Sequence, residues 1–188
     1  MSDTATSNAL DVAAQAVRAL TLYALSEFQS GNATTIVVSA EGTSFSVSDD
    51  GRGHAIDRTV AGSPYLPFIY THLHYPFGRL EGGPVQLHGI GMSLLNALCS
   101  ELSVTVRKKS ETLSLSFRAG RLHEELHRDQ ATGATGNTVT GTVNSQLQSA
   151  RTDAESIEQW LAGVLAANPG LRLNFNGKVL HAPPADDA

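Results

Sequence analysis

The sequence predicts an α+β fold, a two-layer sandwich in which helices cover one face of a mixed, mainly antiparallel sheet. Two observations predict it. Helical segments alternate along the chain with strand-like segments, and several of these strands are joined by short turns that favour antiparallel pairing. The 188 residues fit one domain with a single core. We assign residues 1–9 to a disordered N-terminus, 10–181 to the domain and 182–188 to a tail.

The first third of the chain predicts a helix followed by a hairpin. Residues 10–28 carry apolar side chains at spacings of three and four, which is typical of an amphipathic helix, and "SGN" ends it. The segments "TTIVVSA" and "SFSVS" flank the turn "EGT", which predicts two antiparallel strands. The second strand leads directly into "DDGRG", so two adjacent carboxylates are expected at a strand end.

The middle of the chain predicts a long connection and a second helix. The connection is rich in Gly, Pro and aromatic residues and contains one short helix around "LPFIYTHLH". The segment "GIGMSLLNALCSEL" then predicts a helix that begins at glycines, with Leu94, Leu95, Leu98 and Leu102 on its inner face. Cys99, the single cysteine, lies in this run, which excludes a disulfide framework and a cysteine-based zinc site.

The remainder of the chain predicts strands, a third long helix and a hairpin. The strands are "LSVTVRK", "TLSLSFRAG" and a later one near residues 139–143, which follows the polar loop "RDQATGATGNTVTGT". The segment "DAESIEQWLAGVLAAN" starts with acidic residues, as a helix N-terminus should. Finally, "LRLNFNGKVLH" reads as strand, Asn-Gly turn and strand.

Composition restricts the partners and the compartment. The net charge of −5 disfavours attraction to phosphate backbones, so direct DNA binding is not expected. The N-terminus lacks a basic flank, and no apolar run approaches the ~20 residues of a membrane span. We therefore expect a cytoplasmic protein. No metal is assigned to the seven histidines, because no HExxH pattern is present.

Asp49 is the first candidate site residue. It ends a predicted strand and is followed by Gly51 and Gly53. A carboxylate there can accept a charge-assisted hydrogen bond from the amino group of a purine, worth roughly 1.5–3 kcal/mol, and the glycines leave room for the ring. A hairpin turn closed by Asp and Gly explains the same residues, so this motif alone does not decide.

Two further motifs carry the same ambiguity. Gly89 and Gly91 precede a helix whose free N-terminal amides suit a phosphate, although a helix can simply begin at glycine. Thr142, in "TGT", offers a hydroxyl to a base edge, although β-propensity also explains a threonine in a strand.

In their order along the chain these motifs resemble a known family. "VSDDGRG", "THLHYPFGRLEGG", "LHGIGMSLLNALCSELSVTV" and "TGTV" are similar to the ATP-binding domain of the B subunit of DNA gyrase and its topoisomerase IV counterpart, which are GHKL ATPases with the Bergerat fold. The resemblance covers about residues 10–181. It implies that ATP is the cofactor.

The resemblance also implies roles for individual residues. Asp49 matches the adenine-binding aspartate, with Gly53 beneath the base, Thr142 beside it and Arg52 packed nearby. Residues 57–86 match the ATP lid. The backbone expected to wrap the phosphates is that of Leu87, His88, Gly89, Ile90 and Gly91.

The first helix departs from the family. The family's catalytic glutamate and magnesium-binding asparagine fall on Ala19 and Tyr23, or on Arg18 and Leu22 if the register shifts by one residue. Neither register restores the pair, and Glu27 lies two turns farther along. We therefore assign no catalytic residue, and the departure puts Mg2+ binding in doubt. Loss of a general base typically lowers a rate 10²- to 10⁴-fold.

The sequence thus predicts a stand-alone domain that binds an adenine nucleotide with little or no hydrolysis and acts through a protein partner or a second copy. Two alternatives stay open. One is an interaction module that keeps only the GHKL fold and binds no nucleotide. The other is an active type II topoisomerase ATPase that a partner chain completes.

Overall fold

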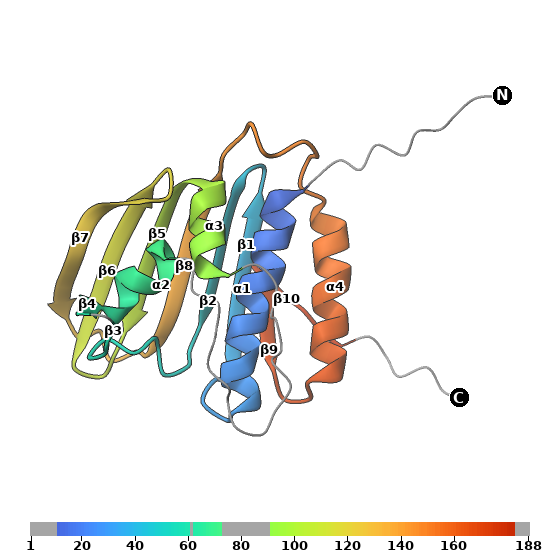
Figure 1. Cartoon of the computed structure of the whole chain (residues 1–188). Coiled ribbons are helices and arrows are strands. Elements are labelled where there is room, and N and C mark those ends of the chain that lie inside the picture. Colours follow the sequence, from blue (N-terminus) through green and yellow to red (C-terminus); the bar gives the residue numbers. More distant parts are fainter. Residues whose placement is uncertain (1–10, 61, 73–90, 183–188) are drawn as a thin grey trace, which may run out of the picture.

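The computed structural model describes residues 11–60, 62–72 and 91–182 (Figure 1). The helices are α1 (Val12–Gln29), α2 (Tyr65–Thr71), α3 (Met92–Leu98) and α4 (Ala154–Ala167). The strands are β1 (Thr35–Glu41), β2 (Ser44–Asp49), β3 (Thr59–Val60), β4 (Ser63–Pro64), β5 (Cys99–Arg107), β6 (Glu111–Arg118), β7 (Arg121–Gln130), β8 (Gly136–Val143), β9 (Arg172–Phe175) and β10 (Lys178–Val179).

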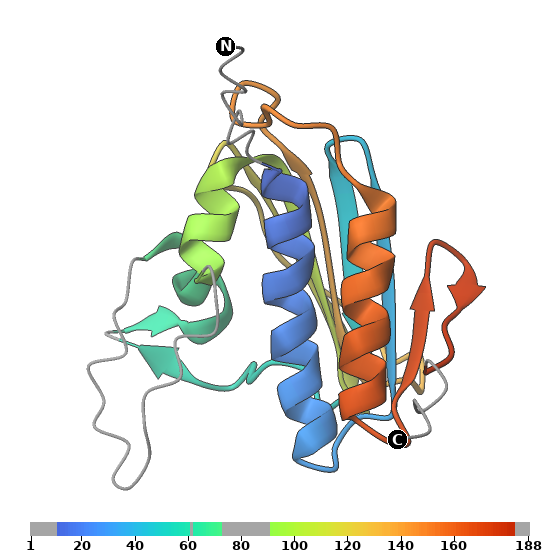
Figure 2. The ribbon, with the colours of Figure 1, turned by 90° about the vertical axis from the view of Figure 1, so that its right-hand side faces the viewer.

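The strands form one large sheet and one small one. Within the described residues the large sheet has eight strands in the order β10-β9-β1-β2-β8-β5-β6-β7, and β3 pairs with β4 separately. The β1–β9 pair is parallel, and the other pairs are antiparallel. In Figure 2, α1 and α4 lie side by side across one face of the large sheet, with α3 beside α1. The predicted two-layer α+β sandwich is confirmed.

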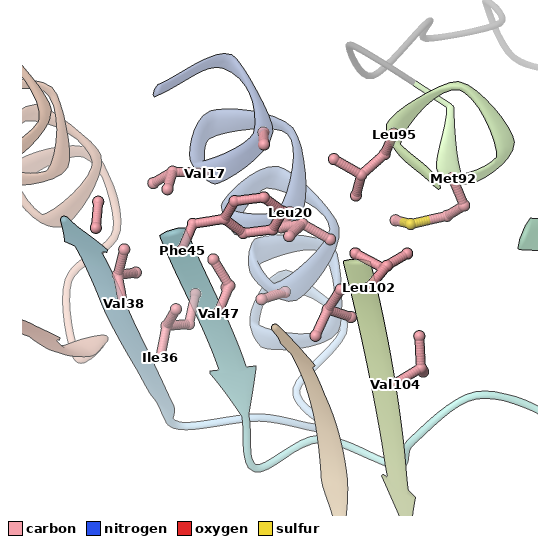
Figure 3. Close-up of a cluster of buried hydrophobic side chains, with 14 of the residues drawn as sticks. Val17, Leu20, Ile36, Val38, Phe45, Val47, Met92, Leu95, Leu102 and Val104 are labelled. Atoms are coloured by element: carbon pink, nitrogen blue, oxygen red, sulfur yellow. The ribbon is translucent and has the colours of Figure 1, made fainter. Parts of the chain in front are cut away.

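The core lies between α1, α4 and the inner face of the sheet. Val17 and Leu20 of α1 lie over Phe45 and Val47 of β2, as Figure 3 shows, and all four side chains are buried. Both long helices start at a capping aspartate. Asp11 accepts a hydrogen bond from the backbone N of Ala14, and Asp153 does the same for Ser156. These caps explain where the amphipathic patterns begin.

The prediction for the second helix was wrong at its C-terminal end. α3 ends at Leu98, and Cys99 begins β5, where it pairs with Val143 of β8. Leu95 is buried as expected, but Leu94 is 45% exposed and Leu102 belongs to the strand. A short apolar run is compatible with either a helix or a buried strand, and the pairing of β5 with β8 and β6 decides it here. Burial raises the pKa of the Cys99 thiol to about 12, which keeps it protonated.

Strand β7 was not predicted. It forms an edge of the sheet and pairs only with β6 among the described strands. Its sequence, "RLHEELHRDQ", is dominated by charged and polar residues and lacks the apolar alternation of the other strands. Charges on an edge strand hinder pairing with a second molecule. The same charges hide the strand from an analysis based on hydrophobic periodicity.

The outer face of the sheet is lined with hydroxyl groups. No helix of the described residues covers this face (Figure 2). Hydroxyl side chains lie opposite one another across β1, β2, β8, β5 and β6, in a row formed by Ser39, Ser46, Thr140, Ser103 and Ser116. Because these residues alternate with buried apolar ones, the sheet needs only one layer of helices.

Gly141 provides a test of the packing between β2, β8 and β5. A Cβ atom at this position would lie 2.5 Å from Cζ of Phe45 and 2.9 Å from Cδ1 of Leu102. We expect Gly141→Val to lower the free energy of unfolding by about 1–3 kcal/mol through overpacking, measured by urea denaturation. Gly163→Ala in α4 is the control, because a Cβ there meets nothing within 4 Å. Equal stability of the two variants would contradict this packing.

Candidate functional site

A cavity of about 500 Å³ lies where the C-terminal half of α1 crosses the end of β2. The loop that follows β2 forms one wall, and residues of β8, α2 and α3 complete it together with Lys108, which follows β5. Three of the predicted site residues line it, Asp49, Arg52 and Gly53. The structure therefore brings the "DDGRG" motif to a cavity that also receives Tyr23 and Glu27 from α1.

Asp49 faces the interior because of the alternation of β2. Phe45, Val47 and Asp49 share the inner face of the sheet, and Asp49 is only 8% exposed. Its Oδ1 accepts a hydrogen bond from the backbone N of Gly51 at 2.8 Å, and its Oδ2 accepts one from Nδ2 of Asn137 at 3.2 Å. Burial raises the pKa of Asp49, and these hydrogen bonds offset only part of that shift. The result is a partly satisfied carboxylate in the cavity wall.

The side chain of Asp50 bonds to the start of β1. Its Oδ1 accepts hydrogen bonds from the backbone N of Thr34 at 2.7 Å and of Thr35 at 2.9 Å, and its Oδ2 accepts one from the Thr34 hydroxyl at 2.6 Å. Partial burial raises the pKa of Asp50, but the hydrogen bonds from Thr34 and Thr35 outweigh it, so the net pKa is lowered. The second aspartate therefore fixes the start of β1 and does not line the cavity.

Arg52 is held by Glu27. The guanidinium donates from Nη2 to Oε1 at 2.8 Å and from Nε to Oε2 at 3.1 Å, and the backbone N of Arg52 also donates to Oε2. The hydrogen bond from Arg52 is the main reason why the pKa of Glu27 is lowered. Glu27 is thus an ionised carboxylate held in an ion pair, and its lowered pKa makes it a weaker base toward water.

Gly53 has a backbone conformation that favours glycine. Its φ is +72°, and a Cβ would lie 3.0 Å from both the carbonyl oxygen of Arg107 and Cγ1 of Val106. The Lys108 ammonium donates to the carbonyl oxygens of Arg52 and Gly53, each at 2.8 Å. The loop therefore packs tightly on the end of β5, which explains the glycine without reference to a ligand.

His54 completes this side of the cavity. Its backbone N donates to Oδ1 of Asn137 at 2.8 Å, and its Nε2 lies 3.4 Å from the hydroxyl of Tyr70. Burial is the main cause that lowers the pKa of His54 to about 4, with help from Lys108 and against the opposing effect of Glu27. The imidazole is neutral at pH 7.

The α1 side of the cavity lacks a water-activating group. Tyr23 lines the cavity, whereas Ala19 is buried and does not reach it. In the alternative register, Arg18 donates to the Ser156 hydroxyl and lies over the ring of Trp160 in α4, while Leu22 packs against the core. Both registers therefore leave the cavity without a carboxylate or a carboxamide at the two expected positions.

Comparisons with known proteins bear on the family and the fold of the chain. No protein-family model matches the chain. The chain is 30% identical over 162 residues to the DNA gyrase B subunit of Streptococcus pyogenes, a match that covers 82% of this chain and 25% of that protein. The chain therefore spans about a quarter of the length of this curated relative.

Two solved structures share the fold with a TM-score of 0.73 each. One is the 43K ATPase domain of Thermus thermophilus gyrase B in complex with an aminocoumarin, at 28% identity, covering 88% of this chain and 44% of that one. The other is the topoisomerase IV ATP-binding domain of Francisella tularensis with a small-molecule inhibitor, at 21% identity, covering 85% and 78%. The chain belongs to the GHKL ATP-binding domains of the gyrase B and topoisomerase IV type.

One expected site residue of this GHKL domain is misplaced. Thr142 lies opposite Ser44, at the far end of β2 from Asp49, and its hydroxyl is 3.3 Å from that of Ser44. It lies on the outer face of the sheet, while Asp49 lies on the inner face. The structure therefore does not place Thr142 beside an adenine at Asp49, and Asn137 occupies that position in β8.

The predicted phosphate segment is described only at its last residue. Leu87, His88, Gly89 and Ile90 lie outside the described residues. Gly91 is the N-cap residue of α3 with a φ of −65°, and a Cβ there would meet nothing within 4 Å. Among the described residues, nothing at this position therefore requires a glycine.

The predicted lid, residues 57–86, is described in its first half only. Within that half, α2 places Leu66, Ile69 and Tyr70 in the core, and the Tyr70 ring contacts Phe117 of β6 at a centroid distance of 5.5 Å. This part is a fixed wall of the domain. Residues 73–86 lie outside the described residues.

Sequence reasoning missed Asn137, His54 and Lys108. A signal for Asn137 was present, because Val139 is apolar in a strand with one buried face, which puts residues 137, 139 and 141 on the inner side and Thr142 on the outer side. His54 and Lys108 gave no such signal, since their burial and contacts arise from tertiary packing.

None of the helices in the described part of the chain is long and apolar enough to cross a membrane.

The lowered pKa of His54 predicts a loss of stability in mild acid. The unfolded chain binds a proton at His54 near pH 6.5 and the folded chain only near pH 4, so this contribution is present above pH 6.5 and is lost as the pH falls between these values. The loss is up to about 3 kcal/mol. Chemical denaturation at pH 7 and pH 4 should show a smaller loss for His54→Gln than for wild type.

The matched control for that measurement is His181→Gln, which removes an exposed imidazole. It should follow wild type at both pH values. An identical acid loss in His54→Gln and wild type would show that His54 is not the group responsible.

Proposed function

We propose that this chain is a gyrase-B-like GHKL domain that binds an adenine nucleotide in the cavity at Asp49, hydrolyses it little or not at all, and acts through a protein partner or a second copy. The observation that carries the proposal is Asp49, a buried carboxylate turned into a cavity and held by Gly51 and Asn137. The Thermus and Francisella domains, described as an ATPase domain and an ATP-binding domain, support it by their fold.

Asp49 is suited to reading an exocyclic amino group. Each of its oxygens accepts one described hydrogen bond, and a carboxylate can accept more than two in total. An amino group from the ligand would add a charge-assisted hydrogen bond inside a desolvated site. This hydrogen bond would also stabilise the ionised form of Asp49, which burial disfavours.

The same cavity is poorly equipped for hydrolysis. A general base must lie within hydrogen-bond reach of the attacking water. Ala19 has no basic group, and the carboxylate of Glu27 is occupied by Arg52. Burial, together with Tyr65, raises the pKa of Tyr23, so its phenol keeps its proton. A nucleotide would therefore be held without turnover.

Thermal melting with and without millimolar ATP or ADP, each with and without Mg2+, tests nucleotide binding. A ligand at 100 times its dissociation constant stabilises the folded state by about 2.7 kcal/mol. We expect a clear upward shift. No shift at several millimolar would favour the nucleotide-independent interaction module.

Asp49→Asn should weaken nucleotide binding by about 10- to 100-fold, because a charged acceptor for the adenine amino group is lost. Isothermal titration with ATP measures this. Asp50→Asn is the matched control, since this neighbouring carboxylate bonds only to Thr34 and Thr35 among the side-chain contacts of the described residues. It should lower the melting temperature and keep the affinity. Equal affinities of wild type and Asp49→Asn would remove Asp49 from the site.

The purified chain should release phosphate from saturating ATP at the background rate, because Ala19 and Tyr23 stand where the family has its general base and its magnesium ligand. A phosphate-release assay checks this, with Asp49→Asn reporting contaminating ATPases. Steady release by wild type that disappears in Asp49→Asn would show an active ATPase, including one whose base comes from a second copy.

A further inference from the structure

Among the described residues, the charged side chains that line the cavity leave a small positive excess. Glu27 and Asp49 supply two negative charges, and Arg52, Arg58 and Lys108 supply three positive ones. With His54 neutral, the sum is three minus two, or plus one. The Glu27 and Arg52 charges neutralise each other in an ion pair at 2.8 Å. An anionic ligand would therefore meet Arg58 and Lys108.

Arg58 is the side chain placed to contact such an anion. Its guanidinium lies 5.0 Å from the centroid of the Tyr65 ring, and its carbonyl oxygen accepts a hydrogen bond from the backbone N of Tyr65 at 2.8 Å. Within the described residues it forms no ion pair. A guanidinium stacked on an aromatic ring keeps its N–H donors for a phosphate.

Lys108 contributes less to an anion. Two of its three N–H donors are directed to the carbonyl oxygens of Arg52 and Gly53. Burial is the main cause that lowers its pKa, which shows that its charge is already partly desolvated. One guanidinium and part of one ammonium can balance a single phosphate group.

The cavity does not fit Mg2+, which the family resemblance implies. Mg2+ takes oxygen ligands in near-octahedral geometry, usually one or two carboxylates of the protein together with waters and substrate phosphates. The described residues that line the cavity include two carboxylates. Glu27 is held in the ion pair with Arg52, and Asp49 is buried and bonded to Gly51 and Asn137. No group of three or more His, Cys, Asp or Glu side chains among the described residues is arranged to hold a metal. Tyr23 supplies only a phenol.

We propose that the cavity binds an adenosine ligand carrying one phosphate, without a metal ion, and that Arg58 contacts this phosphate. The inference rests on the proposed adenine site at Asp49. A triphosphate carries more negative charge than these side chains balance, and Mg2+ normally neutralises that excess. A monophosphate needs no metal. The affinity of the cavity for adenosine monophosphate should therefore be higher than its affinity for ATP with Mg2+.

Isothermal titration of the full chain with adenosine, adenosine monophosphate and ATP, each in EDTA and in Mg2+, tests this ranking. The affinity for the monophosphate should agree within about two-fold between EDTA and Mg2+. It should exceed the affinity for adenosine by about ten-fold, the equivalent of one phosphate contact of about 1.4 kcal/mol. ATP with Mg2+ should not bind more tightly than the monophosphate.

Arg58→Gln should remove the ten-fold advantage of the monophosphate and leave the affinity for adenosine unchanged, which also shows that the variant is folded. Arg151→Gln is the matched control, because Arg151 is exposed and does not line the cavity. It should behave as wild type. An unchanged monophosphate advantage in Arg58→Gln would overturn the assignment of Arg58.

The failures of the two proposals are distinguishable. ATP that binds about ten-fold more tightly in Mg2+ than in EDTA, and more tightly than the monophosphate, overturns the metal-free inference and leaves the adenine site intact. Absence of binding by all three ligands, or equal binding by wild type and Asp49→Asn, overturns the proposed adenine site itself.

Discussion

The site depends on the alternation of β2, which turns every second side chain toward the helices. Phe45 and Val47 are fixed by the apolar core under α1, and Asp49 follows them on the same face at the point where the strand ends. The hydrophobic effect that buries the first two therefore also sets the direction of the carboxylate. Its burial is tolerated because Gly51 and Asn137 supply hydrogen bonds.

The loop after Asp49 is anchored to four neighbouring parts of the domain. Asp50 binds the start of β1, Arg52 binds Glu27 of α1, and the carbonyl oxygen of Gly53 accepts from Lys108 at the end of β5. The backbone N of His54 donates to Asn137 of β8. A site held in this way is organised before a ligand arrives, so little conformational entropy is lost on binding at this end.

Much of the fold could be predicted from local patterns, but the contacts of the site could not. The helix at residues 12–29, the β1–β2 hairpin and the Asn-Gly hairpin show strong periodicity or turn signals. Strand β7 lacks such a signal because it is a charged edge. The position of Asp49 at the end of a strand could be predicted from its motif, whereas the Glu27–Arg52 pair joins residues 25 positions apart and has no local signature. Thr142 was predicted from the motif "TGT", whereas the alternation of β8 places Asn137 on the face of the sheet that carries Asp49.

The hydroxyl groups on the outer face of the sheet affect how accurately β2 and β8 find each other during folding. A slip of two residues keeps every side chain on its own face and brings hydroxyl opposite hydroxyl again, so the outer face scarcely distinguishes the correct alignment from its neighbours. The inner face does, because Phe45 lies opposite Gly141 and a slip would set it against Val139 or Val143. The fidelity of this pairing therefore rests on one large side chain that meets a residue without a side chain.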